Sequence, residues 1–288
     1  MGNKLLNWLL FAALCTIWGS SFILMKGGMQ VLSPYEVASI RLLSAGLVLI
    51  PFFWRSVQRI PADKRWLVIL SGLLGSFFPA YLFCIAETKI DSALAGILNA
   101  LTPLFVIMVG FSFFGLKVKF IQTIGILIGF IGLCLLVILG NNINLQYFQY
   151  AFLVLIATLF YGINVNMVGR YMKGIGSIDI AAMAFVFLII PCTIFLYFSG
   201  YFHYPVHQQS YWLSTLASAT LGIFGTAIAS IIFYMLVKRA GPLFASMVTY
   251  GIPFVAIGWG IWGGEHVNMQ QVVCLSVILI GVYLANRK

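Results

Sequence analysis

Apolar runs of membrane-spanning length, separated by short polar connections, follow one another along the whole chain. About 18 to 25 helical residues, rising about 1.5 Å each, are enough to cross a hydrocarbon core of roughly 30 Å. The pattern predicts ten transmembrane helices and no connection long enough for a soluble domain. They are expected at Leu5 to Gly27, Tyr35 to Trp54, Trp66 to Glu87, Ser92 to Phe114, Phe120 to Leu139, Tyr147 to Val168, Ile178 to Tyr197, Leu213 to Val237, Pro242 to Trp262 and Met269 to Ala285.

The second half of the chain echoes the first. When Pro103 is aligned with Pro253, an offset of 150, residues Gly72, Gly75, Ser76, Phe83 and Gly110 fall on Gly222, Gly225, Thr226, Phe233 and Gly260. Nearer the start of each half, Trp18 and Ser21 lie opposite Tyr161 and Asn164 at an offset of 143. Self-similarity of this length predicts a duplication, with one repeat at 1–141 and the other at 142–288.

Basic residues gather in alternate connections. One set holds Lys4, Arg55, Arg59, Lys64, Arg65, Lys117, Lys119, Arg170, Lys173, Lys238, Arg239, Arg287 and Lys288, whereas the other holds only Lys26 and Lys89. By the positive-inside rule, both termini are expected in the cytoplasm. With five helices per half, the two repeats then have opposite orientations. The predicted fold class is an all-α polytopic membrane protein with ten transmembrane helices as two inverted five-helix repeats, a recurrent plan of secondary transporters.

The composition agrees with a membrane protein and changes little else. With 62% hydrophobic and 8% charged residues, a soluble domain is excluded. The net charge of +10 is spread over short clusters, so we expect a lipid bilayer around the chain and no nucleic-acid partner. The acids, histidines and cysteines form no catalytic or metal-binding motif. We therefore expect no enzyme activity, no catalytic residue, no metal and no cofactor.

Arg41 is the ionisable residue that the pattern places deepest within a span. An unpaired guanidinium is costly there, so its side chain should face a cavity or a partner. It would either receive an anionic group of a substrate, or pair with Glu87 or Glu265 and lock helices together. Lys26, Glu87 and Glu265 all map near the outer side, where they are candidates for an outer gate or for proton coupling.

Further polar and aromatic residues within spans are candidates for a central substrate cavity. The aromatic and polar pairs Trp18 with Ser21 and Tyr161 with Asn164 each share a helix face, and they recur in both halves. The alternative is ordinary packing with interhelical hydrogen bonds. The other candidates are Tyr81, Asn99, Thr102, Tyr234, Thr249 and Tyr250.

Two prolines recur at matching positions within spans. Pro103 and Pro253 each remove a backbone donor, and a paired kink would serve as a symmetric hinge or as a fixed packing feature. The polar residues just before them, among them Thr102 and Thr249, could bond the carbonyls that a proline frees instead of a ligand.

Landmarks in order along the chain carry a family resemblance. Trp18-Gly19, Ser33-Pro34 with Arg41, Pro103 with Gly115, and Pro253 with Gly264-Glu265 resemble the EamA family of the drug/metabolite transporter superfamily. The resemblance implies a ten-helix carrier of small metabolites, often an exporter of amino acids or related compounds, without covalent chemistry. One departure is Gly115-Leu116, where the family usually has Gly-Glu.

The preferred hypothesis is a secondary transporter of the plasma membrane, or of the inner membrane in a bacterium, that exports amino acids or related metabolites by alternating access. Its partners are a small-molecule substrate and the bilayer, and the sequence leaves monomer and homodimer open. The alternatives are a passive facilitator, a permease for sugars or nucleotide sugars, and a membrane-embedded enzyme acting on lipid.

Overall fold

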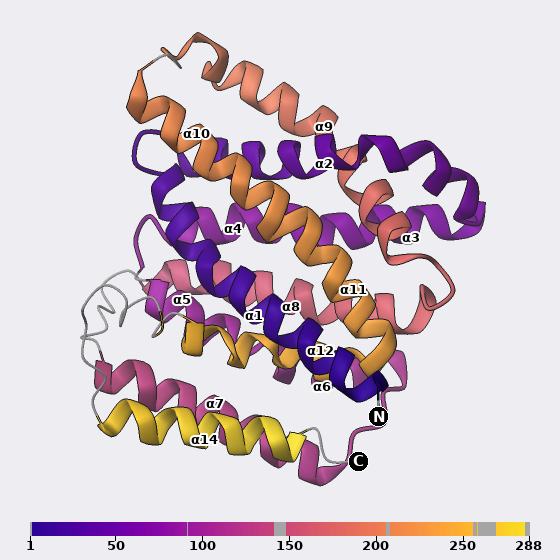
Figure 1. The fold of residues 1–288 in the computed structure, drawn as a ribbon, viewed down its shortest axis with the longest axis vertical. Helices are drawn as coiled ribbons and strands as arrows, with labels where there is room; N and C mark the ends of the chain where they lie inside the picture. The colour runs from indigo at the N-terminus through magenta and orange to yellow at the C-terminus, as the bar shows by residue number, and fades with distance from the viewer. Residues whose placement is uncertain are drawn as a thin grey trace.

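The computed structural model of the protein describes residues 2–90, 92–140, 148–205, 208–255, 258 and 269–285. Every element in these residues is helical (Figure 1). The elements of the first half are α1 Gly2–Gly28, α2 Pro34–Arg59, α3 Ala62–Gly72, η1 Leu73–Phe77, α4 Phe78–Ala86, α5 Ser92–Asn99, α6 Thr102–Phe114 and α7 Phe120–Gly140. Those of the second half are α8 Phe148–Tyr171, α9 Ser177–Phe198, η2 Tyr201–His203, α10 Gln209–Gly222, η3 Ile223–Ile228, α11 Ala229–Ala240, α12 Pro242–Ser246, η4 Met247–Tyr250 and α14 Met269–Ala285.

Six helices of the described chain are long and apolar enough to cross a membrane. Two of them are compound rods, because α3, η1 and α4 run on without a break, as do α10, η3 and α11. Shorter apolar helices are Thr102–Phe114, Phe120–Leu136, Pro242–Val255 and Val272–Ala285. The protein is therefore an all-helical polytopic membrane protein, as the hydrophobic pattern predicts.

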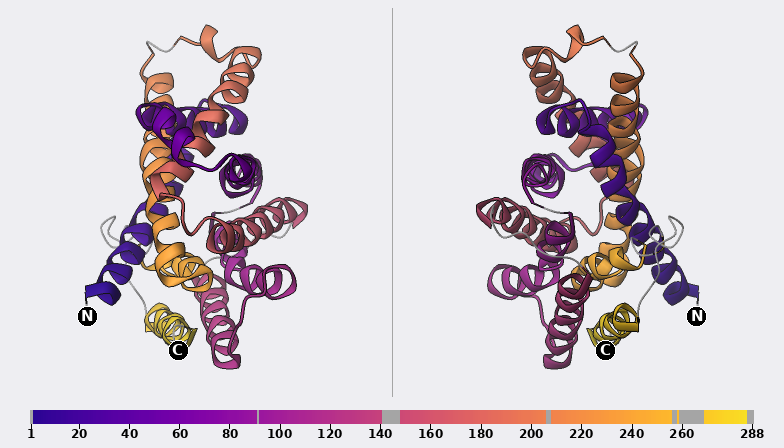
Figure 2. Two further views of the ribbon diagram at one scale, coloured as in Figure 1. Left: turned by 90° about the vertical axis from the view of Figure 1, so that its right-hand side faces the viewer. Right: turned by 90° about the vertical axis from the view of Figure 1, so that its left-hand side faces the viewer.

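The helices lie across the long axis of the molecule and are stacked one after another along it (Figure 1). The pair α2 and α9 lies toward one end and the pair α7 and α14 at the other, and these two pairs have the most extensive contacts (Figures 1 and 2). The start of α1 and the end of α14 lie on the same side of the molecule (Figure 1). Between the two outer pairs lie α1, α8, α12 and the two compound rods.

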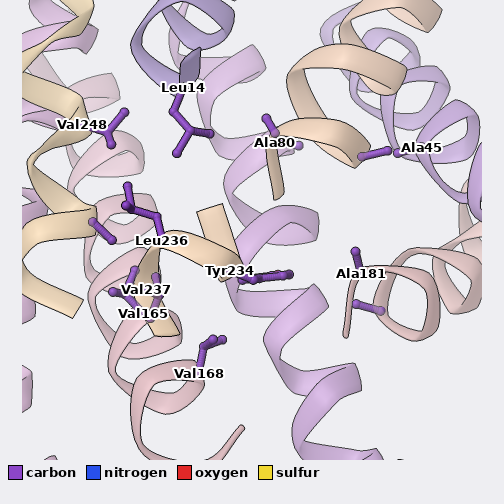
Figure 3. Packing of buried hydrophobic residues seen from close by; sticks show 14 of the residues in the cluster. Leu14, Ala45, Ala80, Val165, Val168, Ala181, Tyr234, Leu236, Val237 and Val248 are labelled. Atoms are coloured by element: carbon purple, nitrogen blue, oxygen red, sulfur yellow. The ribbon is translucent and has the colours of Figure 1, made fainter. Parts of the chain in front are cut away.

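Close helix contacts depend on small residues, as expected where lipid provides no hydrophobic force between helices. Gly281 of α14 faces Gly125 and Gly129 of α7, where backbone meets backbone. The core nearer the middle is built from alanine and branched aliphatic side chains. Figure 3 shows Val165 of α8 beside Val237 of α11, both with at most 1% of their surface exposed.

Local sequence signals fix where several helices begin and end. Ser33 caps α2 in a capping box: its Oγ accepts from the backbone N–H of Glu36 at 3.3 Å, and its own N–H donates to Oε2 of Glu36 at 2.8 Å. Gly115 ends α6 with φ of 62°, a left-handed conformation that favours glycine. Both signals were among the family landmarks.

The structure breaks two expected spans rather than bending them. The helix expected at Ser92 to Phe114 is interrupted between α5 and α6, and Pro103 lies in the first turn of α6. The span expected at Pro242 to Trp262 starts as α12, tightens into the 3₁₀ turn η4, and resumes as helix over 252–255, which includes Pro253. A proline has no backbone N–H, and the first turn of a helix does not need this donor, so a proline starts a helical segment more readily than it continues one. The remainder of this span lies largely outside the described residues.

Candidate functional site

A cavity of about 130 Å³ lies among the central helices. Its wall comes from α1, α2, α8, α12, η4, the ends of α5 and α6 that meet at the break, and the middle of both compound rods. On α1 it uses residues from Trp18 onward and on α2 it uses Arg41, so it lies toward the side opposite the chain termini. The expected cavity candidates that line it are Trp18, Ser21, Arg41, Asn99, Thr102, Tyr161, Asn164, Tyr234 and Thr249.

Two aromatic pairs flank the cavity. Trp18 of α1 packs on Phe233 of α11 with ring centroids 5.2 Å apart, and Tyr161 of α8 stacks on Phe83 of α4 at 6.2 Å. Trp18 matches Tyr161 in the sequence echo, and Phe83 matches Phe233. Each pair therefore joins a helix of one half to the rod of the other half. Exchanging the two halves would exchange the two pairs.

A second set of contacts repeats the same relation. Gly75 of η1 packs against Asn164 of α8, where an added Cβ would come within 2.8 Å of Cγ of Asn164. Gly225 of η3 packs against Ser21 of α1, where an added Cβ would lie 2.8 Å from Oγ. The two glycines match at an offset of 150, and Ser21 matches Asn164 at 143.

Both of these glycines lie in π-helical segments. The segments η1 Leu73–Phe77 and η3 Ile223–Ile228 occupy corresponding places in the two rods. A π-turn is uncommon and inserts an additional residue into a helix, often at a functional site. Here the η3 segment presents the carbonyl of Gly225 to Nε1 of Trp18, which donates to it at 3.1 Å.

Arg41 extends from α2 into the cavity and is half-buried. Its Nε donates to Oγ1 of Thr226 at 2.6 Å, and Oγ1 of Thr226 donates in turn to the carbonyl of Leu221 at 3.4 Å. Among the described residues, Thr226 is the hydrogen-bond partner of the guanidinium. The alternative partner, Glu265, lies outside the described residues. Arg41 thus links the two halves through a neutral hydroxyl.

The polar residues beside the helix breaks serve the backbone. Oγ1 of Thr102 donates to the carbonyl of Asn99 at 2.6 Å, and this is the carbonyl that Pro103 leaves without its usual helical donor. Oγ1 of Thr249 donates to the carbonyl of Ser246 at 3.1 Å. These hydroxyls occupy the cavity wall while their protons are engaged, so they present oxygen lone pairs to the interior.

Some expected candidates lie elsewhere. Tyr81 and Tyr250 are not among the residues that line the cavity. The hydroxyl of Tyr81 is 2.7 Å from Oγ of Ser39, and the fully buried Tyr250 donates to the carbonyl of Ile126 at 2.9 Å. Lys26 is exposed, and Glu87 caps the end of α4 beyond the cavity.

Sequence reasoning did not single out several wall residues. Ser76, Phe83, Thr226 and Phe233 all line the cavity. Each belongs to the echo between the halves, so membership in a repeated pair was the signal that pointed to them. Ser230 and Ser246 also line the cavity, and no comparable signal marks them.

The fold defines a polytopic helical membrane protein with a mostly uncharged cavity among its central helices. The sequence profile described as the EamA-like transporter family matches twice, over residues 6–138 and 149–287. The chain belongs to this family, as the landmarks indicated.

A bacterial and an archaeal relative are named as transporters. The chain is 27% identical to the uncharacterized inner membrane transporter YedA of Escherichia coli (strain K12), over 94% of this chain and 88% of that protein. It is 24% identical to an uncharacterized transporter of Archaeoglobus fulgidus, over 98% and 99% of the two chains. The WAT1-related protein At3g02690 of Arabidopsis thaliana, chloroplastic, is 26% identical, with 98% and 69% covered. A crystal structure at 17% identity superimposes with a TM-score of 0.71 over 97% of this chain and 96% of the other, which shows a shared fold.

Proposed function

We propose that the protein is a secondary transporter that carries small organic metabolites across the membrane by alternating access. The observation that carries the proposal is the cavity, whose wall takes corresponding residues from both halves of a chain that belongs to a transporter family. Such a site between two repeats is where secondary transporters bind substrate.

The two halves are proposed to be inverted repeats, at 1–141 and 142–288, with both termini in the cytoplasm. Support comes from the exchanged contact pairs: Trp18 with Phe233 and Tyr161 with Phe83. The double match of the family profile and the shared side of the first and last described helices agree with it.

Alternating access requires that the seam close at one end while it opens at the other. At the end nearer the termini, Val165 and Val168 of α8 are buried with Leu236 and Val237 of α11, which we interpret as the closed side (Figure 3). Pro103 and Pro253 lie next to the breaks in matching helices, and they are proposed as the paired hinges on which the halves rock.

The cavity limits the size of the substrate. A water molecule requires about 10 to 15 Å³ of cavity volume, so roughly ten waters would fill the 130 Å³. An organic molecule of roughly ten non-hydrogen atoms would fill it equally. This favours amino acids and related amphipathic metabolites, as the family resemblance implies, over nucleotide sugars. We propose export as the direction.

Passive facilitation is a second candidate because one observation favours it. The described residues that line the cavity include no aspartate, glutamate or histidine to carry a coupled proton. Coupling would then depend on Glu87, at the end of α4, or on Glu265. A transport rate that does not change with a pH gradient would support passive facilitation. Accumulation of the substrate against its own concentration gradient would support proton coupling.

The test is transport by purified protein in liposomes. A panel of labelled amino acids and related metabolites is screened with and without a pH gradient, and the contents are checked by mass spectrometry. Saturable, protein-dependent flux of an unmodified compound is the expected result. Chemical conversion of a lipid or solute without flux would instead support a membrane-embedded enzyme.

A cysteine pair tests alternating access directly. Val165→Cys combined with Val237→Cys, oxidised to a disulfide, should fix the buried seam between α8 and α11 and abolish flux, and reduction should restore it. Val165→Cys alone and Val237→Cys alone, oxidised in the same way, are the controls, and they also report on any disulfide with the native cysteines. Undiminished flux through the cross-linked protein would refute a mechanism in which this seam must open.

A further inference from the structure

One feature of the cavity wall has no counterpart in the other half. Gly72 of α3 packs against Ala184 of α9, where an added Cβ would lie 2.9 Å from Cβ of Ala184. Its match, Gly222 of α10, packs against Oγ of Ser44 and the carbonyl of Arg41 in α2. Arg41 and Ala184 therefore occupy corresponding places, 143 residues apart. A cavity that is otherwise paired thus has its cation on one side only.

The guanidinium is held in a fixed orientation. Thr226 has 2% of its surface exposed and accepts from Nε of Arg41, while its own proton is engaged with the carbonyl of Leu221. A guanidinium carries its donors in a rigid planar fork that matches the two oxygens of a carboxylate. Once Nε is anchored, the two terminal nitrogens, for which no hydrogen bond is recorded in the described chain, form such a fork at the cavity wall.

The remainder of the wall suits an apolar body without a second charge. The same wall holds the aromatic pairs of Trp18 with Phe233 and Tyr161 with Phe83. The described wall holds Arg41 as its one formal charge and no carboxylate. An ammonium group on the substrate would therefore meet no counter-ion among these residues and would be repelled by the guanidinium.

We infer that the cavity binds a small organic monocarboxylate, with the carboxylate on Arg41 and an aromatic or other flat apolar body between the two ring pairs. This inference rests on the proposed transport function. Among the metabolites proposed there, it selects the related carboxylates without a free amine over the amino acids themselves. Substrates would lie in the cavity with one fixed polarity, set by the charge on α2.

The test uses four ligands that share one ring and chain length and differ in charge. They are 3-phenylpropionate, its neutral amide 3-phenylpropanamide, the zwitterion phenylalanine and the cation phenethylamine. Binding to the purified protein in lipid nanodiscs is measured by isothermal titration calorimetry. We expect the wild-type protein to bind the monoanion roughly 10- to 100-fold more tightly than each of the others, as for loss of a charge-assisted hydrogen-bonding partner.

Variants assign this preference to the proposed contact. Arg41→Gln should bring the affinities for the monoanion and the amide to within about twofold, and Arg41→Lys should keep part of the preference because it keeps the charge without the fork. Thr226→Val, close in shape to threonine, should weaken binding of the monoanion more than binding of the amide, because it releases the anchored guanidinium. Arg65→Gln is the matched control, because Arg65 is likewise half-buried and hydrogen-bonded, in its case to the backbone carbonyls of Val57 and Ile60, but lies outside the cavity.

Several results would overturn the inference. They are equal binding of acid and amide by the wild-type protein, binding of phenylalanine as tight as that of the monoanion, a preference that survives Arg41→Gln, or no binding of any of the four ligands. None of these results would refute transport, since the liposome screen of other compounds could still succeed. If the liposome screen found no flux while the protein still bound the monoanion selectively, the transport function would be refuted and the carboxylate site at Arg41 would stand.

Discussion

The packing of α7 against α14 gives a prediction whose magnitude follows from geometry. In Gly281→Ala the new methyl group would lie 2.5 Å from Cα of Gly129 and 2.6 Å from the carbonyl oxygen of Gly125. Carbon atoms in contact prefer about 3.5 to 4.0 Å, so the helices must separate by about 1 Å. Backbone atoms of a helix cannot rotate away as a side chain would.

Two effects set the expected size of the change. Overpacking costs about 1 to 3 kcal/mol, and alanine regains about 0.5 to 1 kcal/mol over glycine within a helix. Because the clashing atoms belong to the backbone and cannot move aside, we expect an overpacking cost of about 2 to 3 kcal/mol. The net destabilisation is then about 1 to 2 kcal/mol. At about 2 to 4 °C per kcal/mol, the melting temperature should fall by several degrees.

The assay is thermal unfolding of the detergent-purified protein, followed by tryptophan fluorescence. Gly96→Ala in α5 is the matched control, since an added Cβ there has no atom within 4 Å. This control should keep or raise the melting temperature. If Gly281→Ala proved as stable as Gly96→Ala, α7 and α14 would not approach as closely as described, and the reasoning from backbone contact would be refuted.

Three further changes test single hydrogen bonds by the same unfolding measurement. Tyr250→Phe removes the bond to the carbonyl of Ile126 and should cost about 0.6 kcal/mol, typical of interhelical hydrogen bonds in membranes, while ligand affinity stays unchanged because the residue lies outside the cavity wall. Asn166→Ala removes the bridge from α8 to the carbonyl of Val106 in α6, 2.9 Å away, and should cost at least as much; a wild-type melting temperature would show that the bridge contributes nothing. Ser33→Ala removes the cap of α2 and should cost about 1 kcal/mol, whereas Ser33→Asp should restore most of it.

Much of the fold could be predicted from the sequence because hydrophobic length determines a membrane helix almost by itself. The starts and ends also carried local signals, such as the cap at Ser33 and the glycine at Gly115. The breaks before Pro103 and Pro253 were harder to predict. A proline inside an apolar run is compatible with a kink as well as with a break, and the choice depends on neighbours that satisfy the freed groups, as Thr102 does for Asn99.

The candidate site divides in the same way. Residues that recur in both halves, such as Trp18 and Tyr161, could be predicted from the sequence. The same pattern at matching positions in two halves is improbable by chance. The partner of Arg41 could not be found, because nothing near Arg41 in the sequence indicates that α2 meets η3. Opposite charges suggested Glu87, but the guanidinium bonds to a threonine. Tyr250 was drawn into the candidate set by its place beside a proline, although its side chain points to α7.

The π-helical segments change how the rods should be compared along their length. An α-helix advances about 100° per residue, so a single additional residue in a turn rotates everything after it by about that angle. In an unbroken α-helix Leu221 and Phe233 would differ by about 120° around the axis, and the additional residue in η3 takes up about 100° of this difference. Leu221 before η3 and Phe233 and Tyr234 after it therefore line the same cavity. Deleting one residue from this turn would leave the length and hydrophobicity of the span almost intact and swing both rings away from the cavity.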